Sequence, residues 1–239
     1  VKGFPALVYV PNTQSNTVQV YDQKTYKLLR TVKVAREPQH VVPSYDLKTL
    51  YANSDLGNSL MPFDAKTGKP GKRIPLLDPY NLYFTPNGKY AVVMQERMKQ
   101  IAFADPHTFK IKKTLKTKCA GVNHADWTAD GNIFIASCEF SGTIIEVNTA
   151  EMKIINEQFI PDTYAKHSAS THDGLPNLGP QPQDVKLSPD GKTFYIADMM
   201  SDGIWTMPAP WGKLTYINTG FGAHGLYVTR DAQKLIITN

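Results

Sequence analysis

The chain has 239 residues, of which 41% are hydrophobic, and its 26 Lys and Arg exceed its 21 Asp and Glu to give a net charge of +5. This balance excludes an acidic or low-complexity disordered chain, and no apolar run reaches the ~20 residues that a membrane-spanning helix needs. The 16 Gly and 17 Pro are spread along the chain, which disfavours long helices and favours short strands joined by turns.

A six-residue turn recurs along the chain and ends each time in Lys. Its copies are DQKTYK (22–27), DAKTGK (64–69), DPHTFK (105–110), NTAEMK (148–153) and PAPWGK (208–213). A second turn alternates with it and contains Asp-Gly or Asn-Gly in three of its copies, a strong hairpin signal, at 44–48, 85–89, 128–132, 188–192 and 229–234. Short apolar segments separate the turns, and four strands per ~40 residues are typical of a β-propeller blade.

The repeat therefore predicts an all-β fold, with a single propeller domain of four-stranded blades over residues 1–239. Its phase sets the blades at about 6–36, 37–77, 78–120, 121–162, 182–220 and 221–239, with an insertion at 162–181. The first blade begins at its second strand and the last stops after its second strand, so that about five and a quarter blades are expected.

One polar residue opens each predicted innermost strand, and repeat symmetry should bring all five together at the mouth of the central channel: His40, Asn81, His124, Asp184 and His224. Four of them could bind copper or zinc through imidazole and carboxylate groups, namely His40, His124, His224 and Asp184. Met199 and Met200, in a turn on the same face, favour copper, unless one of them is buried between blades. The alternative to a metal is a water-filled channel that simply needs hydrogen-bonding side chains.

The insertion and the two cysteines lie at the same predicted face. The insertion adds two further ligand candidates, His167 and His172, and forms either a lid over the channel or a surface excursion. Cys119 precedes an innermost strand and Cys138 ends the strand after it, so a disulfide requires the intervening loop to fold back. Two free thiols and metal ligation are the alternatives.

Four strand ends resemble the terminal motif of the YVTN-repeat propellers: YVPN (9–12), YANS (51–54), YIAD (195–198) and IITN (236–239). QDVKLSPDGKTFYIAD (183–198) resembles the fuller motif. The resemblance implies a secreted, periplasmic or cell-surface propeller, usually of seven blades, so we expect these 239 residues to be part of a longer propeller. Similar propellers include surface-layer proteins, lactonase-like enzymes, and domains of nitrous oxide reductase and of haem nitrite reductases. The chain has no CxxCH haem-attachment motif.

The leading hypothesis is a non-enzymatic or cofactor-holding extracytoplasmic propeller that binds a small-molecule ligand, a metal or a protein partner at the channel face. A metal-assisted lactonase-like hydrolase, a copper oxidoreductase and an adhesive surface-layer module are the alternatives. No nucleophile elbow, phosphate loop or dinucleotide fingerprint is present. The basic residues are scattered without interleaved aromatic residues, so no nucleic-acid partner is expected.

Overall fold

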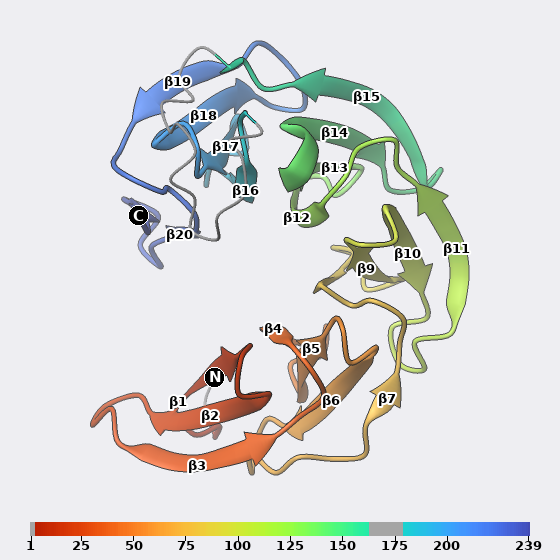
Figure 1. Cartoon of the computed structure of the whole chain (residues 1–239), viewed down its shortest axis with the longest axis vertical. Helices are drawn as coiled ribbons and strands as arrows, with labels where there is room; N and C mark the ends of the chain where they lie inside the picture. The colour runs from red at the N-terminus through yellow and green to blue at the C-terminus, as the bar shows by residue number, and fades with distance from the viewer. Residues whose placement is uncertain (1–2, 163–178) are drawn as a thin grey trace. The chain divides into compact units, whose positions relative to one another are not determined.

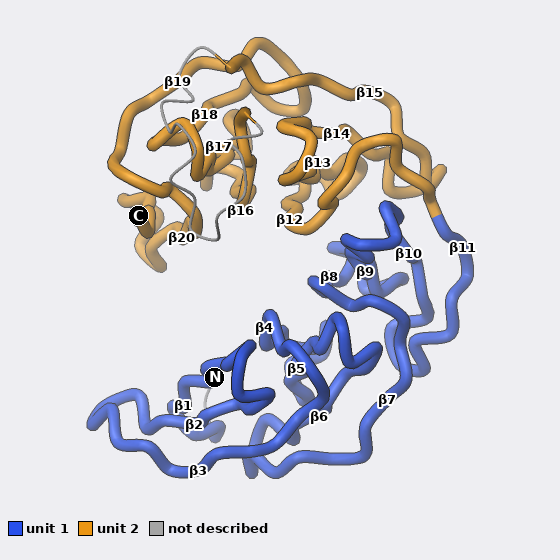
Figure 2. The backbone as a smooth tube through the Cα atoms, in the orientation of Figure 1, with its two compact units in different colours: residues 1–114 blue, residues 115–239 orange. Residues whose placement is uncertain are grey.

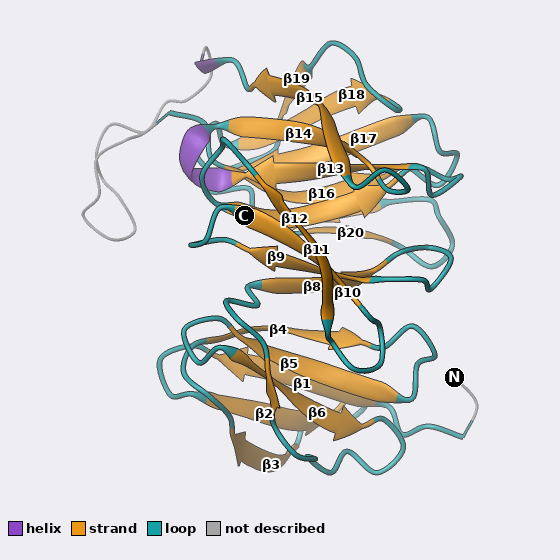
Figure 3. Cartoon of the chain, turned by 90° about the vertical axis from the view of Figure 1, so that its right-hand side faces the viewer, coloured by secondary structure: helices purple, strands orange, loops and turns teal. Residues whose placement is uncertain are grey.

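The computed structural model describes residues 3–162 and 179–239. Strands dominate these residues, and a short 3-10 helix, η1 (Glu139–Ser141), follows one of them (Figure 3). The chain forms two compact units, residues 1–114 and 115–239 (Figure 2), which are taken in turn. None of the helices among the described residues has the length and apolar character of a membrane span.

Unit 1 contains three antiparallel sheets whose strands pair in chain order (Figure 1). The first has three strands, β1 (Leu7–Asn12), β2 (Thr17–Asp22) and β3 (Leu28–Lys33). The second has four, β4 (Pro38–Pro43), β5 (Thr49–Ser54), β6 (Ser59–Asp64) and β7 (Ile74–Pro75). The third has four, β8 (Asn81–Phe84), β9 (Ala91–Gln95), β10 (Gln100–Ala104) and β11 (Ile111–Lys116), the last of which runs into unit 2.

Unit 2 continues the same pattern. One four-stranded sheet comprises β12 (Val122–Trp127), β13 (Ile133–Cys138), β14 (Thr143–Asn148) and β15 (Lys153–Phe159). The next comprises β16 (Pro182–Leu187), β17 (Thr193–Asp198), β18 (Gly203–Pro208) and β19 (Thr215–Asn218), and a two-stranded sheet pairs β20 (Leu226–Val228) with β21 (Leu235–Ile237). These sheets confirm the predicted all-β class and the four-stranded antiparallel unit.

Local hydrogen bonds explain the sequences of the two recurring turns. In the Lys-ending turn, Asp105 Oδ1 accepts the backbone N–H and the hydroxyl of Thr108, both at 2.9 Å, and Phe109 then has a φ of 57°. In the other turn, Thr128 Oγ1 donates to Asp130 Oδ1 at 2.6 Å, and Gly131 has a φ of 72°. Because that position needs a positive φ, glycine is favoured there, which explains the Asp-Gly signal.

The apolar core lies between neighbouring sheets of the same unit. In unit 2, Ile135 and Ile144 of one sheet pack in a cluster with Phe194, Trp205 and Met207 of the next, and all five are buried. This packing fixes adjacent sheets face to face, so the ends of their first strands present side chains at a defined position.

Candidate functional site

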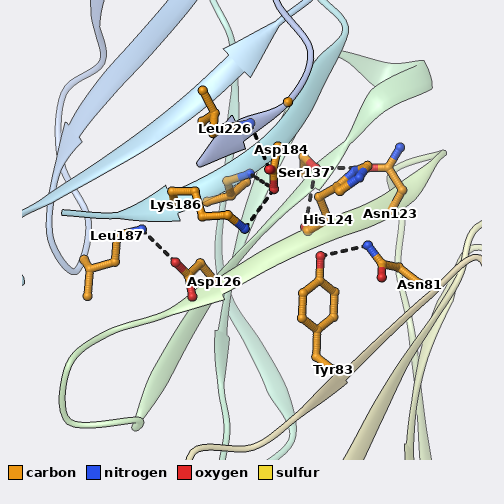
Figure 4. Close-up of polar contacts among 12 residues, drawn as sticks. Asn81, Tyr83, Asn123, His124, Asp126, Ser137, Asp184, Lys186, Leu187 and Leu226 are labelled. Carbon is orange, nitrogen blue, oxygen red and sulfur yellow. Dashed lines mark hydrogen bonds and ion pairs between the residues drawn. The ribbon is translucent and has the colours of Figure 1, made fainter. Parts of the chain in front are cut away.

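The structure places His40 near the start of β4 and Asn81 at the start of β8, both in unit 1. The His40 ring packs edge-to-face against Tyr80, with 5.4 Å between ring centroids. Asn81 is bonded within its own strand, because its Nδ2 donates to Tyr83 Oη at 2.9 Å (Figure 4). Its Oδ1 accepts the Leu82 N–H, also at 2.9 Å.

In unit 2 the structure brings together three of the predicted residues, His124, Asp184 and His224. The two histidine rings lie edge-to-face with 6.4 Å between centroids, and the Asp184 N–H donates to the His224 carbonyl at 3.2 Å. The Asp184 carboxylate accepts the Lys186 ammonium at 3.1 Å through Oδ1 and the Leu226 N–H at 3.0 Å through Oδ2 (Figure 4). Asp184 therefore ties β16 to the start of β20.

Asp126 makes an equivalent tie that the sequence analysis missed. Its Oδ2 accepts the Leu187 N–H at 2.8 Å and so joins β12 to β16 (Figure 4). Asp126 lies two residues after His124 in the same strand. That spacing was the only signal in the sequence, and it does not distinguish a backbone tie from a ligand-binding group.

Within residues 3–162 and 179–239, no group of three or more His, Cys, Asp or Glu side chains is arranged to hold a metal ion. The four residues predicted to bind copper or zinc belong to both units: His40 is in unit 1, and His124, Asp184 and His224 are in unit 2. The candidates His167 and His172 lie outside the described residues. Binding of a metal by these residues stays a prediction.

His124 and His224 are uncharged at neutral pH. Burial lowers the pKa of His124 to about 3, and electrostatic repulsion from His224 in its protonated form and from Lys186 contributes to the lowering. Burial also lowers the pKa of His224, against the opposing effect of the Asp184 carboxylate. The site therefore holds neutral imidazoles, which can form hydrogen bonds or bind a metal.

A hydrogen-bonded chain links His124 to a carboxylate on the neighbouring turn. The Asn123 Nδ2 donates to Glu139 Oε2 at 2.7 Å. The Asn123 Oδ1 lies 3.0 Å from both Ser137 Oγ and His124 Nδ1 (Figure 4). The link itself is not visible in the sequence, because Glu139 follows His124 by fifteen residues and joins it only through the pairing of β12 with β13.

The turn that carries Glu139 is held to the loop before β12 by backbone bonds and by a disulfide. The Glu139 N–H donates to the Gly121 carbonyl at 3.0 Å. Gly121 has a φ of +79°, and a Cβ there would meet Phe140 at 2.8 Å, so the close approach of the two segments requires glycine. The disulfide joins Cys119 to Cys138 with 5.9 Å between their Cα atoms. The loop thus folds back as a disulfide requires.

Gln183 adds a second buried amide to this end of the unit. Burial raises the pKa of Glu139, and Gln183 and Asn123 oppose that rise, so the Gln183 amide lies close to the carboxylate. Gln183 is 1% exposed, yet none of the described residues meets its Nε2 or Oε1 in hydrogen-bonding geometry. We refer to Asn123, His124, Glu139 and Gln183 as the polar cluster.

Unit 1 has a charged cluster at a corresponding turn. Arg97 Nε donates to Asp78 Oδ1 at 2.9 Å, and Arg97 Nη2 donates to the Asp55 carbonyl at 3.0 Å. Burial raises the pKa of Asp55 to about 6. Burial also raises the pKa of Asp78, while the Met98 N–H and Arg97 oppose the rise. These residues tie successive sheets of unit 1 together.

Comparison with known proteins agrees with this architecture. Residues 3–155 match the model of the YNCE-like β-propeller family. None of the curated proteins compared matches the chain in sequence. The fold is similar to that of hydrazine synthase from Kuenenia stuttgartiensis, with a TM-score of 0.78 and 16% identity over 97% of this chain and 70% of that chain.

Two further solved structures are similar. A chain of the mitotic checkpoint complex gives a TM-score of 0.72 and 15% identity over 98% of this chain and 68% of that chain. A candidate 6-phosphogluconolactonase from Bacteroides uniformis gives a TM-score of 0.72 and 17% identity over 97% of this chain and 73% of that chain. At these identities the similarity shows the fold alone, and it confirms the predicted propeller. Because the family model covers more than half of the sequence, the chain belongs to the YNCE-like β-propeller family.

Proposed function

We propose that this propeller is a binding protein that works outside the cytoplasm and holds a small polar ligand at the polar cluster. The observation that carries the proposal is the side chain of Gln183, which is buried without a hydrogen-bonding partner among the described residues. Leaving a buried amide unpaired costs about 1–3 kcal/mol. A ligand that supplies the missing partners offsets this cost, which gives the residue a role in binding rather than in stability.

The Gln183 amide offers one donor and one acceptor, side by side. A complementary ligand places a carbonyl opposite the Gln183 NH₂ group and an N–H opposite the Gln183 oxygen, as a lactam or another cis amide does. We therefore expect the ligand to carry a neutral edge with an N–H and a carbonyl. A carboxylate is disfavoured, because it lacks the donor and would lie beside Glu139.

The test uses 2-pyrrolidinone as the probe and N-methyl-2-pyrrolidinone, which lacks the donor, as its matched control. When each compound is titrated into the protein and followed by NMR, the side-chain amide resonances of Gln183 should shift with 2-pyrrolidinone and not with N-methyl-2-pyrrolidinone. Gln183→Leu should abolish the response of neighbouring backbone amides to 2-pyrrolidinone. Equal binding of the two compounds, or an unshifted Gln183 resonance, would reject the proposed site.

Binding is favoured over catalysis by the weakness of the one imidazole in the polar cluster as a base. An imidazole with a pKa of about 3 is a poor proton acceptor at neutral pH. The lactonase alternative is supported by the similarity to the candidate 6-phosphogluconolactonase. Incubation with 6-phosphogluconolactone, with and without added Zn²⁺, tests it, and we expect no hydrolysis above the spontaneous rate.

The extracytoplasmic location is supported by the disulfide, since structural disulfides persist in oxidising compartments. Alkylation of intact cells before lysis tests this part. Cys119 and Cys138 should be unmodified unless the sample is first reduced, whereas free alkylated thiols would place the protein in a reducing compartment.

A further inference from the structure

We infer that a small pocket in unit 1 binds a trimethylammonium group, such as that of choline. The pocket has a volume of about 130 Å³ and lies where β5 meets the turns at 44–48, 85–89 and 105–110. Its lining includes Tyr45, Asp46, Tyr51, Gly88 and His107. The polar cluster belongs to unit 2, so this inference does not depend on the ligand proposed there.

Two of the lining residues, Tyr45 and His107, depart from the repeat. In the equivalent turns the position of Tyr45 is occupied by Pro86, Ala129, Pro189 and Arg230. The position of His107 is occupied by Lys24, Lys66, Ala150 and Pro210. Because the repeat forms its turns without a ring at either position except for proline, the fold alone does not account for Tyr45 and His107. Both departures line the same pocket, which indicates a role for the pocket itself.

The neighbouring turn holds the ring of Tyr45 in place. The Tyr45 hydroxyl donates to the Pro86 carbonyl at 3.2 Å. A Cβ added to Gly88 would lie 2.4 Å from the Tyr45 ring, so only a residue without a side chain accommodates the ring in this position. Tyr45 is nevertheless 53% exposed. The pocket therefore has a wall that is aromatic, ordered and accessible to a ligand.

Asp46 supplies a negative charge beside this wall. Its Oδ1 accepts the Ser44 hydroxyl at 2.7 Å and the Lys48 N–H at 3.2 Å. These two hydrogen bonds lower the pKa of Asp46, and His107 is near enough to add to the effect, so the carboxylate is ionised at neutral pH. The Lys48 ammonium lies 3.8 Å from Oδ2 on a side chain that is 78% exposed. Such a pair is weak, and a ligand cation can replace the ammonium.

These groups together define the class of ligand. A cation is attracted both to the face of a tyrosine ring and to a carboxylate, whereas an anion would be repelled by Asp46. Methyl groups on the cation suit Tyr51, which is 8% exposed and packs edge-to-face against Phe109 with 5.0 Å between ring centroids. A cavity of about 150 Å³ holds benzene, so this pocket is of the size for a compact head group.

The experiment is an NMR titration of the ¹⁵N-labelled protein with choline, followed at the backbone amide of Gly88. The matched control is 3,3-dimethylbutan-1-ol, which has the shape of choline without its charge. Choline should shift the Gly88 resonance and the alcohol should not. Equal shifts by the two compounds, or no shift with choline, would overturn the inference.

Variants of Tyr45 test the aromatic wall. Tyr45→Leu should weaken choline binding about fivefold, and Tyr45→Phe, which keeps the ring, should bind within about twofold of the parent. Tyr26→Leu is the control, because Tyr26 is an exposed tyrosine in another turn of unit 1, and it should bind choline as the parent does. Equal losses in Tyr45→Phe and Tyr45→Leu would show that the ring does not hold the cation.

Variants of the charged pair test the carboxylate. Asp46→Asn should weaken choline binding about fivefold, while its amide oxygen still accepts the Ser44 hydroxyl, as Asn87 accepts that of Thr85 in the equivalent turn. Lys48→Met removes the competing ammonium and should strengthen binding. Unchanged binding in Asp46→Asn would overturn the inference.

Trimethylammonium groups occur both in free molecules and in lipid head groups, and vesicles of phosphatidylcholine distinguish these sources. Cosedimentation of the parent protein and not of Tyr45→Leu would assign the pocket to the lipid head group. A response to choline without cosedimentation would assign it to a soluble ligand. Both results support recognition of the group, whereas cosedimentation of both proteins without a response to choline would overturn it.

Discussion

The Arg97 guanidinium donates to the Asp78 carboxylate at 2.9 Å, and the two residues come from successive loops of unit 1. Asp78 has no solvent-exposed surface, and its other oxygen accepts the Met98 N–H at 3.0 Å. Arg97 is partly exposed at the surface. The pair therefore neutralises a carboxylate that has no access to water, which differs from an ordinary surface ion pair.

Arg97→Met should reduce the free energy of unfolding by about 1–3 kcal/mol at pH 7, because it leaves the buried charge of Asp78 without its partner while keeping most of the apolar stem. Urea denaturation at low ionic strength measures the effect. Lys48→Met is the control, since Lys48 and Asp46 form an exposed pair at 3.8 Å whose loss should change stability by less than about 0.5 kcal/mol. Equal effects from the two variants would show that burial of Asp78 has no energetic consequence.

Asp55→Asn should stabilise the protein at alkaline pH. Burial raises the pKa of Asp55 from 3.8 to about 6, with Glu37 and Asp78 adding to the rise and Arg97 opposing it. Between those pH values the folded chain binds more protons than the unfolded chain, so the free energy of unfolding decreases as pH rises through this range and stays lower above it.

The uncharged amide introduced by Asp55→Asn removes this loss and keeps an oxygen for the Leu56 N–H. The variant should be more stable than the parent by about 2–3 kcal/mol at pH 8, with a difference that vanishes toward pH 4. Chemical denaturation at both pH values measures it. A constant difference across that range would mean that Asp55 does not titrate there.

Reduction of the disulfide should lower the free energy of unfolding by about 3 kcal/mol, because the bridge closes a loop between residues 19 apart in the unfolded chain. Denaturant titrations with and without dithiothreitol give the value. A Cys119→Ala, Cys138→Ala double variant is the control, and it should match the reduced protein and be unaffected by dithiothreitol. If reduction changed the double variant as well, the reductant would be acting elsewhere.

Gln183→Leu should raise the free energy of unfolding by about 1–2 kcal/mol while removing the response to 2-pyrrolidinone, because a buried amide without partners among the described residues is replaced by an apolar group of similar size. Gln95→Leu is the matched control. Gln95 is also buried, but its oxygen accepts the Gln100 Nε2 at 2.7 Å and its nitrogen donates to the Leu77 carbonyl, so its replacement should destabilise. Opposite signs for the two variants are the expected result, and destabilisation by both would place Gln183 among the structural residues.

The strands and turns could be predicted from the sequence because each repeat satisfies its hydrogen bonds locally. Asp105 with Thr108, and Thr128 with Asp130, lie within three residues of each other, so their spacing is visible in the sequence. Repeat symmetry also indicates His124, Asp184 and His224, which the structure brings together in unit 2.

The roles of these residues could not be predicted in the same way. Whether Asp184 binds a ligand or accepts the Leu226 N–H depends on the register of β16 against β20, which the sequence does not specify. The bond from Asn123 to Glu139 crosses sixteen residues and depends on the register of β12 and β13 and on how the loop at Gly121 packs against Phe140. A repeat motif describes what the blades share, whereas the polar cluster consists of residues in which they differ.

The ties made by Asp126 and Asp184 also bear on how unit 2 opens. The amide hydrogen of Leu187 is held by a carboxylate on β12, and that of Leu226 by a carboxylate on β16. Their hydrogen exchange with solvent therefore depends on the preceding sheet as well as on their own. Sheets joined in this way resist opening one at a time, so the three sheets described in unit 2 should exchange as a single cooperative unit.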